Sequence, residues 1–184
     1  MTISESMSIG VVLERREVDH PWQSHEWVGV AVIPGAPEIG EWRLLDEGEG
    51  WKRYHAGTLE LEIFRKETEG YRLNLMNTPP KVFVVLRYDD EADEGETDDD
   101  ARPAIIPFHA TVCPYEAQIY LDGDEDLVEP IPMPDVVAAW LGDFIEKHHV
   151  DEPRRKRKQT PQAAAEDPRK PGIGGRPASS GDTP

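Results

Sequence analysis

The sequence predicts an α+β protein in which an antiparallel β-sheet domain, sandwich-like or barrel-like, is followed by two C-terminal helices and a disordered basic tail. Two patterns carry this prediction. Short apolar runs closed by turn residues fill residues 8–88, which is typical of strands in an antiparallel sheet. Apolar residues then recur with a helical period over residues 133–150. The length of 184 residues suits a single domain.

About seven segments before residue 89 are predicted to be strands. The clearest alternation is in residues 58–67, and residues 81–88 form a continuous apolar run that suits a central strand. The predicted strands are 8–18, 26–35, 41–48, 51–57, 58–67, 70–77 and 81–88. A meander of these strands should bury one sheet face, formed by Leu59, Leu61, Ile63, Leu73, Leu75, Val82 and Val84.

The second half of the chain is predicted to hold one more strand, residues 104–112, and then two helices. The first helix, 113–123, has Pro114 where a helix start tolerates proline, and it ends at Gly123. The second, 133–150, has an apolar stripe at helical spacing. The stripe consists of Val136, Val137, Trp140, Leu141, Phe144 and Ile145. The acidic residues 122–129 are predicted to form a turn between the two helices.

Charge divides the chain into an acidic body and a basic tail. Residues 1–152 hold 12 Lys and Arg against 34 Asp and Glu, whereas residues 153–184 hold 8 against 3. We expect a flexible N-terminus (1–7), a single acidic domain (8–152) and a disordered tail (153–184). Within the domain, nine carboxylates in residues 89–100 predict a mobile acidic loop over 89–101.

The acidic body argues against binding to nucleic acid or to anionic membranes, because both carry negative charge. Cys113 is the single cysteine, so the chain can form neither an internal disulfide nor a thiolate metal cluster of its own. The N-terminal residues lack a signal-peptide pattern, and the sequence lacks an apolar stretch of bilayer-spanning length. A cytoplasmic protein without a cofactor is the resulting expectation.

The segment ERREVDHPWQSHEW, residues 14–27, concentrates tryptophans, histidines, arginines and carboxylates. His20, His25 and Glu26 are suitable metal ligands, but the two histidines are five residues apart and Pro21 disfavours a helix through both. The favoured interpretation is a turn between two strands, with both tryptophans under the sheet. Exposure of Trp22 and Gln23 would instead indicate an interaction site, and for Trp22 both interpretations stay open.

Three further motifs have weak functional signals. Cys113 at a helix start could be a nucleophile, but a small buried residue is favoured. The acidic residues 122–129 place Leu127 where a calcium loop requires glycine. The glycine-rich residues 172–175 lie in the predicted tail, without a strand before them.

The basic run of the tail is the last candidate. It consists of Arg154, Arg155, Lys156, Arg157 and Lys158, and it resembles a nuclear-localisation or nucleic-acid patch. Next to an acidic body, and without interleaved aromatic residues, it is better explained as a contact for an acidic protein partner.

Three segments carry a family resemblance: ERREVDHPWQSHEW, CPYEAQIYLD (113–122) and residues 128–158. Together, and in this order over residues 8–158, they resemble domain-of-unknown-function family 3305, a bacterial family. Members are often labelled molybdopterin-guanine dinucleotide biosynthesis protein A and occur beside formate dehydrogenase genes. The resemblance therefore implies an accessory role around a molybdenum- or tungsten-dependent formate dehydrogenase, with its subunits or maturation factors as partners.

The enzymatic label does not fit the residues of this chain. A guanylyltransferase holds phosphates on a glycine-rich turn that opens a helix, but this chain has GVVLERREVDHPWQ after its first apolar residues. The predicted elements also lack βαβ alternation. We therefore expect a non-enzymatic accessory or interaction protein. The alternative is a cofactor-handling enzyme of the molybdopterin pathway, for which stabilisation by GTP and Mg²⁺ would be the first sign.

Overall fold

A computed structural model describes residues 2–88 and 105–150. Its first four strands form one antiparallel sheet, sheet A, in the order β2-β1-β4-β3. These strands are β1 (Ser4–His20), β2 (Gln23–Pro34), β3 (Arg43–Gly48) and β4 (Trp51–Phe64). The long strands β1 and β4 pair from Ser4 and Phe64 at one end to Arg16 and Trp51 at the other.

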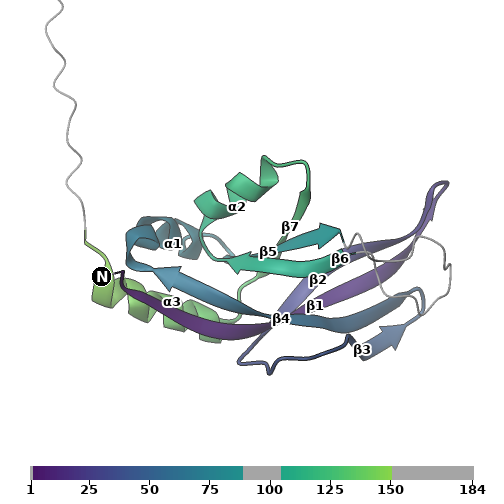
Figure 1. Cartoon of the computed structure of the whole chain (residues 1–184), viewed down its shortest axis with the longest axis horizontal. Helices are drawn as coiled ribbons and strands as arrows, with labels where there is room; N and C mark the ends of the chain where they lie inside the picture. Colours follow the sequence, from purple (N-terminus) through teal and green to yellow (C-terminus); the bar gives the residue numbers. More distant parts are fainter. Residues whose placement is uncertain (1, 89–104, 151–184) are drawn as a thin grey trace, which may run out of the picture. The chain divides into compact units, whose positions relative to one another are not determined.

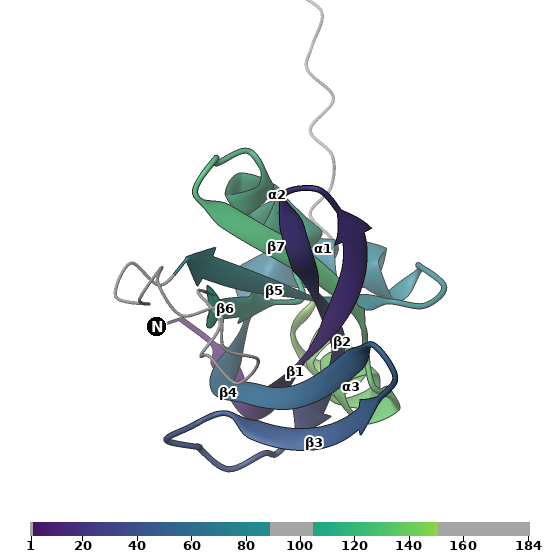
Figure 2. The same ribbon diagram turned by 90° about the vertical axis from the view of Figure 1, so that its right-hand side faces the viewer.

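The other three strands form a second antiparallel sheet, sheet B, in the order β6-β5-β7. They are β5 (Lys81–Tyr88), β6 (Ile105–Thr111) and β7 (Asp126–Pro132). Strand β4 contacts β6 and strand β2 contacts β7, so the two sheets face each other around one core (Figure 2). The predicted α+β class, with an antiparallel sandwich or barrel-like sheet, is confirmed.

Three α-helices and one 3₁₀ turn accompany the sheets. They are η1 (Arg65–Glu67), α1 (Thr68–Leu75), α2 (Pro114–Leu121) and α3 (Asp135–His148). Helix α1 contacts both α2 and α3, and all three lie toward the left of Figure 1, whereas the turn between β1 and β2 lies on the right. Among the described residues, none of these helices combines the length and hydropathy that a bilayer crossing needs.

The core draws on both sheets and on one face of α3. Alternate residues of β1, namely Ile9, Val11 and Leu13, are fully buried, as strand periodicity requires. From α3, the buried residues are Val137, Leu141 and Phe144, which follow the predicted stripe. Val136 of that stripe is exposed instead.

The predicted strand 70–77 is wrong, because residues Thr68–Leu75 form helix α1. Leu73, which the strand would have buried, is exposed, and Leu75 is only partly buried. The buried residues of this helix include Tyr71 and Asn74, three positions apart on one helical face. Among the other residues predicted to share a buried face, Leu61, Ile63, Val82 and Val84 are buried and Leu59 is partly buried.

Three boundaries also differ from prediction. Residues 51–57 and 58–67 largely form one strand, β4, with a register shift against β1 in place of a turn. Strand β1 begins at Ser4, inside the predicted flexible N-terminus, because Ser4 pairs with Phe64. Residues 126–132 form strand β7, although residues 122–129 were predicted to be a turn. The predicted acidic loop and basic tail lie outside the described residues.

Candidate functional site

The tip of the β1–β2 hairpin presents the most exposed large apolar side chain among the described residues. Trp22 is 91% exposed, and Gln23 beside it is also exposed. The turn is closed locally: the Trp22 amide donates to His20 Nδ1 (3.4 Å) and Gln23 Nε2 donates to the His25 carbonyl (2.6 Å). The predicted turn is therefore present, and of the two interpretations left open for Trp22 the structure shows the exposed one.

Trp27 has the structural role that was expected of it. Its ring packs against Trp42 and Tyr54, with centroid separations of 5.4 and 5.8 Å, and Trp42 and Tyr54 also contact each other. Trp27 and Trp42 are partly buried against the core. The Trp27–Trp42 pair is edge-to-face, an arrangement that stabilises aromatic clusters. The two tryptophans of residues 14–27 therefore differ in environment: Trp27 packs against the core, whereas Trp22 is exposed to solvent.

Glu14 lies at the other end of the same segment and is buried. Its two carboxylate oxygens accept hydrogen bonds from Arg16 Nε and Arg53 Nε, each 2.5 Å long. Burial opposes ionisation of Glu14, but the hydrogen bonds and positive charges of the two arginines outweigh it and lower its pKa. Arg16 thus pairs with a carboxylate of its own strand.

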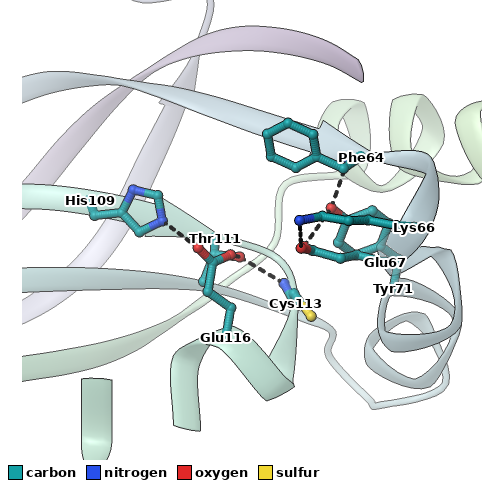
Figure 3. Close-up of polar contacts among 8 residues, drawn as sticks. All are labelled: Phe64, Lys66, Glu67, Tyr71, His109, Thr111, Cys113 and Glu116. Carbon is teal, nitrogen blue, oxygen red and sulfur yellow. Dashed lines mark hydrogen bonds and ion pairs between the residues drawn. The ribbon is translucent and has the colours of Figure 1, made fainter. Parts of the chain in front are cut away.

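A second polar network joins β6 to the start of α2 (Figure 3). Glu116 Oε1 lies 3.0 Å from His109 Nε2, and Glu116 Oε2 accepts a 2.6 Å hydrogen bond from the Thr111 hydroxyl. The same hydroxyl oxygen accepts the Cys113 amide proton at 3.0 Å. His109, the largest influence, and Thr111 lower the pKa of Glu116 against the opposing effect of burial.

This network is a modified capping box. Cys113 is the N-cap of α2 and makes no side-chain cap, while Glu116 occupies the third helical position, where a capping box places its carboxylate. Here Thr111 connects the carboxylate to the N-cap amide. The arrangement satisfies groups at the helix start, and it also fixes His109 beside the ring of Tyr120. Helix capping is therefore a sufficient explanation for the geometry of this network.

Cys113 lies in the core next to a second pair of contacts in Figure 3. The Tyr71 hydroxyl donates to Glu67 Oε2 (3.2 Å) and accepts from the Phe64 amide (3.0 Å). Burial, the main cause, raises the pKa of the Cys113 thiol and also that of Tyr71. A protonated thiol is a poor nucleophile, so the surroundings of Cys113 suit the favoured packing role.

The remaining predicted sites are scattered or undescribed. Within residues 2–88 and 105–150, no three His, Cys, Asp or Glu side chains form a group able to hold a metal ion. Asp126 of the rejected calcium motif pairs with Arg87 at 2.7 Å. The basic run Arg154–Lys158 lies outside the described residues. Every strand pair of the described part is antiparallel, whereas the nucleotide-binding βαβ unit contains parallel strands.

Sequence reasoning missed two of these clusters. Arg53 meets Glu14 only through the β1–β4 register, which the sequence does not specify. The sequence did contain a pattern that could have revealed the Glu116 cluster. Thr111 precedes Pro114 and Glu116 lies in the first helical turn, which resembles a capping box with its threonine displaced.

The model of a protein family described as "Protein of unknown function (DUF3305)" matches residues 8–158. No curated protein and no solved structure matches the chain. The matched region covers both sheets except the first four residues of β1, and it includes α1, α2, α3, the hairpin tip and the basic run. The chain therefore belongs to the DUF3305 family.

Proposed function

We propose that this DUF3305 protein is a non-enzymatic, cytoplasmic accessory protein that binds a protein partner through the tip of its β1–β2 hairpin. The observation that carries the proposal is the 91% exposure of Trp22. Exposing most of an indole to water is unfavourable. Tryptophan is also the residue type most enriched among those that dominate protein–protein binding energy.

The construction of the hairpin tip supports a contact role. Local hydrogen bonds from Trp22 and Gln23 fix the turn, so its indole is presented on an ordered backbone. A fixed contact residue loses less conformational entropy on binding than one on a mobile loop.

The partner that we propose is a subunit or maturation factor of a molybdenum- or tungsten-dependent formate dehydrogenase. This part of the proposal rests on the family resemblance. The basic run Arg154–Lys158 would add a second contact with an acidic patch of that partner. Deletion of residues 153–184 should then weaken capture mainly at low ionic strength.

The test is capture of purified formate dehydrogenase from the source organism by the immobilised full-length chain. Trp22→Ala should weaken binding at least about tenfold without lowering the melting temperature. Met76→Ala is the matched control, because Met76 is also apolar, 79% exposed and distant from the hairpin in sequence. Equal capture by the parent chain and Trp22→Ala would contradict a role for the hairpin. Absence of capture by the parent chain would contradict the choice of partner.

A further inference from the structure

Four residues form a block on the outer face of sheet A. In the β1–β4 register, Glu14 lies opposite Arg53 and Arg16 lies opposite Trp51. Leu13 faces the core, and strand alternation places Glu14 and Arg16 on the other face. This block, the arginine pair Arg16 and Arg53 with Glu14 and Trp51, is independent of the hairpin contact proposed above.

The hydrogen bonds of Glu14 leave much of each guanidinium unused. Glu14 is 4% exposed, and each of its oxygens accepts one Nε–H, from Arg16 and from Arg53. Both of these ion pairs use the Nε atoms. Each guanidinium also carries two terminal Nη groups with N–H donors. With side chains 45% and 44% exposed, the arginines are accessible to a ligand.

Packing also restrains Arg53. Its Cζ atom lies 4.8 Å from the centroid of the Trp51 ring, a cation–π contact. The Trp51 indole in turn lies so close to Gly48 that a Cβ at that position would collide with the ring. The glycine thus lets the indole lie over β3. Glu14 and Trp51 thus both restrain the guanidinium of Arg53, while Arg16 binds the other oxygen of the same carboxylate.

We propose that Arg16 and Arg53 form a binding site for a single oxyanion group, a phosphate or a carboxylate. Glu14 acts as a positioning residue: it occupies both Nε atoms and so orients the Nη donors of the two side chains. Planar guanidinium groups match the oxygen spacing of these anions and form strong charge-assisted hydrogen bonds with them.

The surrounding charge limits the size of the ligand. Glu26 lies opposite Arg16 in the β1–β2 register, and Asp46 lies opposite Arg53 in the β3–β4 register. Residues 1–152 as a whole carry a large excess of carboxylates. A long polyanion would meet this repulsion, which reaches about 8 Å in physiological salt. A small anion or one carboxylate side chain at the arginine pair meets fewer of these carboxylates than a long polyanion does.

The test is a titration of the full-length chain, with the Nε–Hε NMR signals of Arg16 and Arg53 as a local readout. Inorganic phosphate is the probe in one arm and acetate in the other, and sodium chloride holds the ionic strength constant. Saturable shifts of these two signals with phosphate only, or with acetate only, identify the anion type. Saturation in both arms indicates a general oxyanion site, and saturation in neither overturns the proposal.

Variants distinguish a specific anion site at Arg16 and Arg53 from general electrostatic attraction of anions to arginine side chains. Arg53→Gln should weaken binding of the shifting anion about tenfold. Arg65→Gln, which changes an exposed arginine of η1, should leave it unaltered. Equal affinity of Arg53→Gln and the parent chain would overturn the proposal.

The decisive variant is Glu14→Gln, because it removes a negative charge beside the arginine pair. General electrostatic attraction would make anion binding tighter in this variant, whereas loss of positioning makes it weaker. Tighter binding would overturn the role of Glu14. Arg53→Lys keeps the charge and loses the planar fork, so it should also weaken binding and provides a second test if Glu14→Gln does not fold.

Discussion

The indole Nε1 of Trp140 donates a 2.9 Å hydrogen bond to Glu5 Oε2 and so connects α3 to the first residues of β1. The two residues are 135 positions apart in sequence. On the same helix, Phe144 is fully buried, whereas Trp140 is only partly buried. The hydrogen bond and the packing of α3 can therefore be tested separately.

Phe144→Ala should destabilise the fold by about 3–5 kcal/mol, because it leaves a cavity in the core. Trp140→Phe keeps one aromatic ring and loses the Nε1 hydrogen bond to Glu5, which should cost about 1–2 kcal/mol. Urea denaturation of the full-length variants measures both. Val136→Ala, at an exposed position of α3, should change stability by less than about 0.5 kcal/mol. Equal stability of the Phe144→Ala variant and the parent chain would show that α3 is not docked.

Helix α3 could be predicted from sequence because its apolar residues recur with the helical period alone, and the buried residues of the helix follow the same period. Helix α1 could not, because Tyr71, Leu73 and Leu75 alternate as strand residues do. Its actual buried face includes Asn74, whose side chain bonds to Lys81 and Val112. These partners are tertiary contacts, so the local sequence pattern does not predict that Asn74 is buried.

Strand β7 was not predicted from the sequence because it contains two prolines. Pro130 and Pro132 resemble turn residues, but β7 is an edge strand of sheet B, where proline is tolerated. For the candidate site, the sequence predicted a turn between two strands within residues 14–27. It could not decide between burial and exposure of Trp22, because that depends on how far the hairpin extends beyond the rest of the fold.

A second prediction concerns the approach of β2 to β7. An added Cβ on Gly29 would lie 2.8 Å from both Glu129 Cβ and Ile131 Cδ1, and the Gly29 amide donates to Glu129 Oε2 at 3.1 Å. Gly29→Ala should therefore push the strands apart and cost about 1–3 kcal/mol in denaturation experiments.

Gly40→Ala is the control for this substitution, because nothing lies within 4 Å of a Cβ at that position. It should be neutral or stabilise the protein by about 0.4–1 kcal/mol through the unfolded state. Equal stabilities of the Gly29→Ala and Gly40→Ala variants would contradict a tight junction between the two sheets.

The third prediction is a pH dependence that arises from Glu116. The hydrogen bond with His109 is the main cause of its lowered pKa. Because the folded-state pKa lies below the unfolded one, the stabilisation is complete above the ordinary glutamate value of about 4.3 and is lost as pH falls through the folded-state pKa. Glu116→Gln removes this contribution. The stability difference between the parent chain and this variant should therefore shrink as pH falls below about 4.3.

Melting temperatures across pH 2.5 to 7 provide the measurement, with those limits chosen to bracket that window. Glu69→Gln, at an exposed position of α1, is the control for removal of one carboxylate. A constant difference between Glu116→Gln and the parent chain at all pH values would rule out the contribution of the His109–Glu116 pair.

The last prediction concerns the thiol of Cys113. This side chain is buried, and burial raises its pKa, so few thiolates form at neutral pH and those few are shielded from reagents. Alkylation by iodoacetamide at pH 7.5 should be slow in the native protein and fast in urea, as mass spectrometry can follow. Because reaction then requires opening of the core, destabilising variants such as Phe144→Ala should accelerate alkylation. A native rate equal to the rate in urea would mean that Cys113 is accessible, and it would restore the nucleophile interpretation of this residue.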